Sequence, residues 1–222
     1  MNLGKNKTSV SFKILKDLIK DAHKYQYADI ADTEEQIEEK KPKAYFTKTQ
    51  WIILVLAVAA NIVLREGYNT DFCGYVISGL SLFVGIFFTF IIALYDKFND
   101  IEFSQFQITV SEDKCNIGIR LKNYFKKTTV LSLYLILLSI ICILLLSCTL
   151  LFDSFLNQNI NPLEIFKNFQ VNSICCFVQA IVIFIYRSVV FYFLIDFVLM
   201  TVYLTSSIYD YIISEYNKVK LK

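Results

Sequence analysis

The residues of this chain most able to do chemistry inside a membrane are Arg187 and Asp196, two charges within a long apolar stretch. Charged side chains at membrane depth are costly, and by default they indicate a functional site. Ser188, Tyr192 and Tyr203 share one helical face with Asp196, and such a polar stripe suits a bundle interior or a water-filled path. Two roles for Asp196 follow. Its face lines a path for conduction, or hydrogen bonds from neighbouring helices make it purely structural.

The spacing of the two charges separates them. They are nine residues apart, which is about 900° of helix rotation, so they face nearly opposite sides of a straight helix. If the span ends inside near Tyr209, Arg187 lies at the outer interface and its side chain can reach water. If the span begins at Ile174 instead, Arg187 is deep and needs a partner, while Asp196 is buried or nearly buried in both cases.

Catalytic and metal-binding motifs are missing from the sequence. It contains no HExxH, no Gly-rich phosphate loop, no GxSxG and no pair of intramembrane aspartates. The cysteines show no metal spacing, and the single histidine, His23, is expected to be solvated or packed. Cys73, Cys175 and Cys176 fall near the outer ends of apolar stretches, so a disulfide from Cys73 depends on an oxidising outer compartment. We expect a protein that is not an enzyme, uses no metal or cofactor and binds no nucleic acid.

Four apolar stretches must position these residues. They cover approximately residues 51–64, 72–95, 130–152 and 174–209. A hydrocarbon core about 30 Å thick needs about 20 helical residues, so the second and third stretches fit directly. The first is short, and the fourth is too long for a single crossing. Because hydrophobic residues make up 55% of the chain, we predict an all-α membrane protein with a bundle of four transmembrane helices.

The basic residues avoid every second gap between these stretches. Lys and Arg number ten in residues 1–50, none in 66–71, six in 96–129, one in 153–173 and three after Tyr209. Loops rich in Lys and Arg stay on the cytoplasmic side of a membrane. Both termini and the central loop are therefore expected in the cytoplasm, with the chain in a bacterial cytoplasmic membrane.

This pattern divides the chain into five regions. They are a cytoplasmic helical region (1–48), a transmembrane hairpin (49–95), a cytoplasmic insert (96–129), spans three and four with an outer loop at 153–173 (130–209), and a cytoplasmic tail (210–222).

The N-terminal region contains an amphipathic helix over residues 11–27, because apolar residues recur there at helical spacing. Its polar part includes four basic residues, Lys13, Lys16, Lys20 and Lys24. Two interpretations fit. The helix packs on the rest of the cytoplasmic region, or it lies on the anionic inner leaflet of the membrane. Both can hold in different states.

The central insert shows two runs in which apolar and polar residues alternate, separated by a segment of turn composition. This pattern predicts a β-hairpin with one apolar face. An isolated hairpin is marginal in water, so the N-terminal helix or the hairpin of a second subunit must cover that face. Its edge could also recruit a partner by strand addition. The apolar residues are Phe106, Ile108, Val110, Ile117, Ile119 and Leu121.

The second apolar stretch carries small residues at steps of four, three and four, namely Gly74, Ser78, Ser81 and Gly85. Small residues allow helix backbones to approach closely inside a membrane, where no hydrophobic effect drives association. The stripe predicts a tight packing face, either within one subunit or between subunits of a homo-oligomer.

Two classes of function fit this organisation. In the first, an oligomeric membrane protein anchors a cytoplasmic surface that binds a soluble partner and senses the state of the membrane. In the second, the Asp196 face lines a pore. The layout, without any shared residues, is similar to that of small bacterial membrane components of two-gene systems, including those of antiviral defence.

Overall fold

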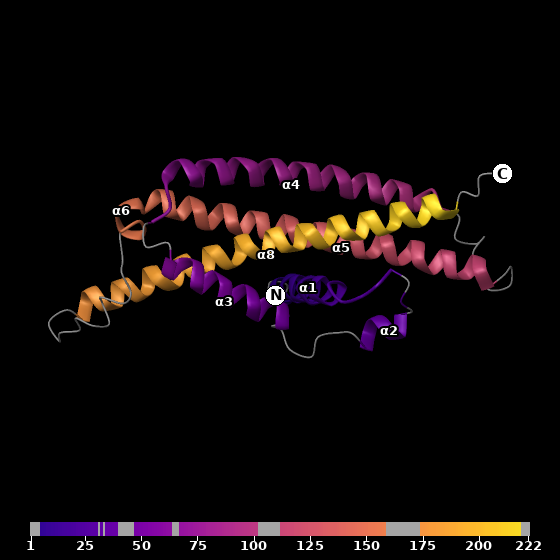
Figure 1. Cartoon of the computed structure of the whole chain (residues 1–222), viewed down its shortest axis with the longest axis horizontal. Helices are drawn as coiled ribbons and strands as arrows, with labels where there is room; N and C mark the ends of the chain where they lie inside the picture. Colours follow the sequence, from indigo (N-terminus) through magenta and orange to yellow (C-terminus); the bar gives the residue numbers. More distant parts are fainter. Residues whose placement is uncertain are drawn as a thin grey trace. The chain divides into compact units, whose positions relative to one another are not determined.

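The computed structural model describes residues 5–30, 32, 34–39, 47–63, 67–101, 112–158 and 174–218, and all regular structure within them is helical. Three helices are long and apolar enough to cross a membrane. They are α4 (Thr70–Asn99), α5 (Glu112–Leu151) and α8 (Ile174–Lys218). The chain is therefore an all-helical integral membrane protein. Figure 1 shows these three helices as its longest ribbons.

The remaining helices are short or amphipathic. Helix α1 spans Lys5–Tyr25, α2 spans Glu34–Glu39, α3 spans Lys48–Val63 and α6 spans Asp153–Leu156. The prediction of a bundle of four spanning helices is not supported, because only three of the described helices are long and apolar enough to cross a membrane. Helix α3 is apolar but has 16 residues, which is about 24 Å of rise and less than a hydrocarbon core of about 30 Å.

The predicted β-hairpin is wrong for its second half. Ile117, Ile119 and Leu121 lie on α5, whereas Phe106, Ile108 and Val110 lie outside the described residues. Three apolar residues at steps of two also satisfy a helix, because the first and third of them are one turn apart. Leu121 packs against the buried cluster that contains Tyr124 and Phe125 of the same helix, so helix packing and not strand pairing buries it in part.

The overlong fourth apolar stretch lies entirely within helix α8. It is one continuous helix of 45 residues, about 68 Å long. The sequence has no Gly or Pro between Ile174 and Lys218, so no residue in it breaks the helix. The stretch therefore extends well beyond a single bilayer crossing.

The chain forms two compact units, and each contains parts of α4, α5 and α8. Unit 1 consists of Met1–Thr47, Ile86–Ile136 and Met200–Lys222. Its core includes Ile30, Leu94, Tyr124 and Phe125. Aromatic rings contribute strongly there. The ring centroids of Tyr124 and Tyr211 are stacked 3.8 Å apart, and those of Phe98 and Phe125 meet edge to face at 5.5 Å.

Unit 2 consists of Lys48–Gly85 and Leu137–Leu199. Its core includes Tyr68, which precedes α4, and one residue from each long helix: Cys73 on α4, Leu146 on α5 and Val190 on α8. Helices α3 and α6 also belong to this unit. The charged residues that the sequence analysis singled out, Arg187 and Asp196, both lie in unit 2.

Candidate functional site

The guanidinium of Arg187 is the centre of a polar network in unit 2. The residue is 3% exposed. Its Nε and Nη2 atoms donate to the carbonyl oxygen of Leu156 at 3.2 and 2.8 Å, and Nη2 also donates to that of Gln158 at 2.6 Å. These carbonyls lie at the end of α6 and just after it, where helical partners run out. Arg187 is therefore deep in the protein, and main-chain oxygens provide the partners that it needs.

Tyr68 connects the same region to the loop before α4. Its backbone N–H donates to Oδ1 of Asn157 at 2.9 Å, and its hydroxyl donates to the carbonyl oxygen of Arg187 at 3.1 Å. Burial raises the pKa of the Tyr68 phenol above its ordinary value, so it stays a neutral donor. A Cβ at Gly67 would lie 2.5 Å from the Cα of Asn157, so this close approach requires glycine.

Asn61 joins α3 to α8. Its Nδ2 atom donates to the carbonyl oxygen of Phe184 at 2.8 Å and to Oγ of Ser188 at 2.9 Å. The Ser188 hydroxyl also donates to the Phe184 carbonyl, at 2.9 Å. Sequence analysis missed Asn61, although it is the one Asn within the apolar stretch at 51–64. Such an isolated polar residue in an apolar helix signals an interhelical hydrogen bond.

Tyr186 makes the corresponding link between α8 and α5. Its hydroxyl lies 3.2 Å from Oγ1 of Thr149 and donates to the carbonyl oxygen of Leu145. Polar side chains therefore connect α8 to α3, to α5 and to the end of α6 within unit 2. Each contact is a hydrogen bond that satisfies a group which would otherwise be costly in an apolar environment.

The predicted polar stripe of α8 is turned toward the protein interior where unit 2 contains it. Asp196 is completely buried and Ser188 is buried, while Tyr192 is half-buried. Tyr203 is also half-buried, but it belongs to unit 1. The structure therefore assigns Arg187, Ser188, Tyr192 and Asp196 to unit 2 and Tyr203 to unit 1.

The small-residue stripe of α4 is exposed over most of its length. Ser78, Ser81 and Gly85 are exposed, and a Cβ added at Gly74 or Gly85 would meet no atom within 4 Å among the described residues. The two serine hydroxyls donate to carbonyl oxygens of their own helix, at 2.9 and 2.8 Å. The described part of the chain leaves most of this stripe exposed, and its role as a tight packing face, within one subunit or between subunits, remains a prediction.

Helix α1 is exposed over residues 12–17, where its described side chains start, and buried at its end. Lys13, Lys16 and Lys20 are exposed, whereas Lys24 is 5% exposed with its ammonium 5.7 Å from the ring centroid of Tyr25. The end of α1 is therefore buried within unit 1. Contact of its exposed start with a membrane surface remains a prediction.

The end of α1 and the chain after it are attached to α5 and α8 in unit 1. His23 Nε2 lies 3.3 Å from the Tyr134 hydroxyl, and Gln26 Nε2 donates to the Met200 sulfur at 3.2 Å. Lys127 Nζ donates to the carbonyl of Ala28 at 2.8 Å. Asn123 Nδ2 donates to the carbonyls of Ile30 and Asp32 at 3.3 and 2.7 Å. His23 is therefore a packed residue.

Cys73 is a buried free thiol and forms no disulfide. The side chains of Cys175 and Cys176 lie outside the described part of the structure. No group of three or more His, Cys, Asp or Glu side chains in the described ranges is arranged to hold a metal ion. Comparisons with family models, with curated proteins and with solved structures found no match to this chain.

Proposed function

We propose that this protein is an oligomeric membrane anchor and sensor whose unit 1 lies on the cytoplasmic side and binds a soluble partner. One observation carries the proposal. Unit 1 contains eighteen of the 22 Lys and Arg residues, nine in Met1–Thr47, six in Ile86–Ile136 and three in Met200–Lys222. The charge rule assigns these three segments to the cytoplasm separately, and the fold gathers them into one compact unit.

This orientation requires an even number of crossings between the N-terminal segment and the C-terminal tail. We propose that α3 is the fourth crossing, although it is short. Lys48 begins the helix, and a long basic side chain can extend from a short helix to the interface. A bilayer also adapts to a short span by thinning, at a modest cost. With three crossings, the two ends of the chain would lie on opposite sides of the membrane.

Helix α1 is the element that can report binding. Its exposed start carries apolar side chains, with Phe12 73% and Ile14 63% exposed. Its buried end contacts α5 through His23, and Gln26, which directly follows α1, contacts α8. A partner that holds the start of α1 therefore acts on the helices of unit 1 through a contiguous set of buried contacts.

Co-purification tests the partner role. The full chain, extracted from its native cells in mild detergent, is expected to retain a soluble protein that the double variant Phe12→Asp/Ile14→Asp loses. Ile212→Asp, which alters an exposed apolar residue of α8 in the same unit, is the matched control. Equal retention by all three proteins, or no retained protein, would contradict a role for α1 in partner binding.

Self-association through α4 is tested by Gly85→Leu. Since a Cβ at Gly85 would meet no described atom within 4 Å, the subunit fold is expected to stay intact while the oligomer dissociates. Leu82→Phe on the same helix, at an exposed position outside the stripe, is the control. An unchanged mass for Gly85→Leu in detergent would reject the α4 interface.

The competing proposal is a pore lined by the Asp196 face. The complete burial of Asp196 within unit 2 favours a structural role over lining a path. Dye leakage on overexpression separates the two proposals. Leakage that Asp196→Asn abolishes would support the pore, whereas intact membranes support the anchor and sensor.

A further inference from the structure

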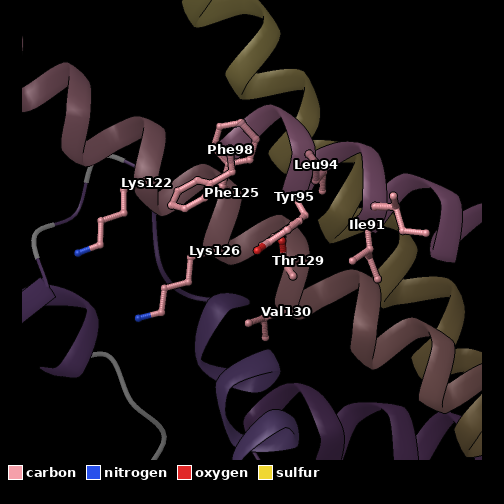
Figure 2. Close-up of a pocket in the computed structure, with 10 residues that line it drawn as sticks. Ile91, Leu94, Tyr95, Phe98, Lys122, Phe125, Lys126, Thr129 and Val130 are labelled. Atoms are coloured by element: carbon pink, nitrogen blue, oxygen red, sulfur yellow. The ribbon is translucent and has the colours of Figure 1, made fainter. Parts of the chain in front are cut away.

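Unit 1 contains an apolar pocket between α4 and α5, with a volume of about 500 Å³. This is within the range of sites that bind small ligands. Figure 2 shows the side chains that line it. Lys122 and Lys126 extend at one end, and Ile91 lies at the other. The wall of the pocket is therefore apolar, and the ammonium groups of Lys122 and Lys126 extend beyond one end of it.

The two lysines form a local concentration of positive charge. They are four residues apart on α5, so they lie on the same helical face with Cβ atoms about 5–6 Å apart. Both side chains are exposed. Val130 follows one further turn along the same face and also lines the pocket. From Lys122 to Val130 the helix rises about 12 Å, over which the lining changes from charged to apolar.

The pocket lies where two apolar stretches of the sequence end. The stretch at 72–95 ends with Tyr95, and the stretch at 130–152 begins with Val130. Both residues line the pocket. In a membrane, Ile91, Ile92 and Val130 would lie toward the hydrocarbon, and the two lysines would lie toward the headgroups. This gradient matches that of a lipid molecule.

We infer that this pocket binds an anionic phospholipid, with the phosphate at the ammonium groups of Lys122 and Lys126 and an acyl chain along the apolar wall. Basic pockets between transmembrane helices on the cytoplasmic side suit anionic headgroups. A free phosphate would not use the apolar wall, and an apolar peptide would not complement the two charges. The inference deepens the proposed function and rests on it for the position of unit 1 at the inner leaflet.

The pocket is connected to the segment that follows α1. Phe125 lines the pocket and belongs to the buried cluster that contains Ile30 and Tyr124. Asn123, on the adjacent turn of α5, holds the carbonyl of Ile30. A bound lipid therefore contacts the same cluster that anchors the chain after α1. The sensor would therefore detect the amount of anionic lipid in the inner leaflet.

The test measures lipid occupancy of the full chain by native mass spectrometry in a neutral detergent, with dioleoyl phosphatidylglycerol and dioleoyl phosphatidylcholine as probes. Each basic residue near an anionic lipid contributes about fivefold in affinity. The unaltered protein should bind phosphatidylglycerol about 25-fold more tightly than phosphatidylcholine. The double variant Lys122→Gln/Lys126→Gln should lose that preference. Lys122→Arg/Lys126→Arg, which keeps both charges, should retain it and show that the site is folded.

The matched control is Lys97→Gln/Arg120→Gln. It removes the same charge from exposed residues of the same two helices, outside the pocket, and should keep the preference. The inference is wrong if the two lipids bind equally to the unaltered protein, or if the control loses the preference as fully as the pocket variant. It is also wrong if inorganic phosphate at equal concentration displaces phosphatidylglycerol, since the lysines would then hold a free anion.

A second pair of variants tests the apolar wall. Ile92→Trp, in the pocket lining, should weaken both lipids, whereas Leu82→Trp, at an exposed position of α4 outside the pocket, should weaken neither. The orientation is scored separately, by labelling Lys97→Cys with an impermeant maleimide. Labelling in intact cells would overturn the proposed function and leave the lipid preference in detergent standing. Protection of Lys97→Cys together with equal lipid binding would overturn only the lipid site.

Discussion

The two units of this protein use polar residues in opposite ways. Unit 2 contains only four Lys and Arg residues, and one of them, Arg187, is buried and held by main-chain carbonyls. Unit 1 contains the other eighteen, many of them exposed, together with a helix that is exposed at its start. Unit 2 thus resembles a scaffold in which Asn61, Tyr186 and Arg187 form internal hydrogen bonds, while unit 1 exposes charged and apolar side chains.

The largest loss of stability is expected when Arg187, which makes several hydrogen bonds within unit 2, is replaced. Arg187→Leu removes the donors of the Leu156 carbonyl, which is buried, and of the Gln158 carbonyl, which is partly buried. Leaving each buried acceptor unsatisfied costs about 1–3 kcal/mol, so a loss of about 3 kcal/mol in unfolding free energy is expected. The measurement is an unfolding titration in mixed micelles. Arg120→Leu, at an exposed position of α5 in unit 1, should change stability little, and equal losses would contradict the comparison.

A smaller loss is expected from Gly67→Ala. The new Cβ would lie 2.5 Å from the Cα of Asn157, so the backbone of one loop must move, and overpacking of this kind costs about 1–3 kcal/mol. Gly79→Ala is the control, because a Cβ there meets no described atom within 4 Å. Thermal unfolding followed by circular dichroism separates the two. A Gly67→Ala protein as stable as Gly79→Ala would reject the close approach.

Asn61→Leu should cost about 1 kcal/mol, because interhelical hydrogen bonds in membranes contribute about that amount or less. The change removes the donor to Phe184 and Ser188 and thereby loosens α3 from α8. Ile62→Leu, at an exposed neighbouring position, provides the reference in the same titration. If the two variants unfold together, Asn61 does not attach α3.

The smallest global effect is expected in unit 1, from His23→Phe. It removes one hydrogen bond to Tyr134, which is worth about 1 kcal/mol, but it should release the end of α1. Trypsin is the probe, since Lys24 is buried while Lys20 is exposed. Cleavage after Lys24 should become faster relative to cleavage after Lys20. An unchanged ratio would mean that the contact does not hold α1.

Sequence reasoning succeeded where a single long pattern decides the structure. The apolar stretches around α4, α5 and α8 are long enough that no other structure accommodates them. It failed over residues 117–121, where three apolar residues at steps of two fit both a strand and one helical turn, and continuation of α5 decides between them. The stretch before Arg65 was likewise too short to predict a spanning helix from its length.

The contacts of the site were only partly predictable. Arg187 and Ser188 stand out as polar residues in an apolar segment. The partners of Arg187 do not, because Leu156 and Gln158 contribute only main-chain oxygens, which every residue has. The contact between Tyr68 and Asn157 joins loops 89 residues apart, and nothing in the sequence around either residue signals it.

The most direct test of the account determines on which side of the membrane the N-terminal and the C-terminal segments of unit 1 lie. In a background without native cysteines, Lys13→Cys and Tyr216→Cys, both at exposed positions of unit 1, are exposed to an impermeant maleimide in intact and in permeabilised cells. Ser154→Cys, exposed in unit 2, marks the opposite side. We predict that only Ser154→Cys reacts in intact cells and that all three react after permeabilisation. Reaction of Lys13→Cys without Tyr216→Cys in intact cells would contradict the account, because α3 would then not cross the membrane.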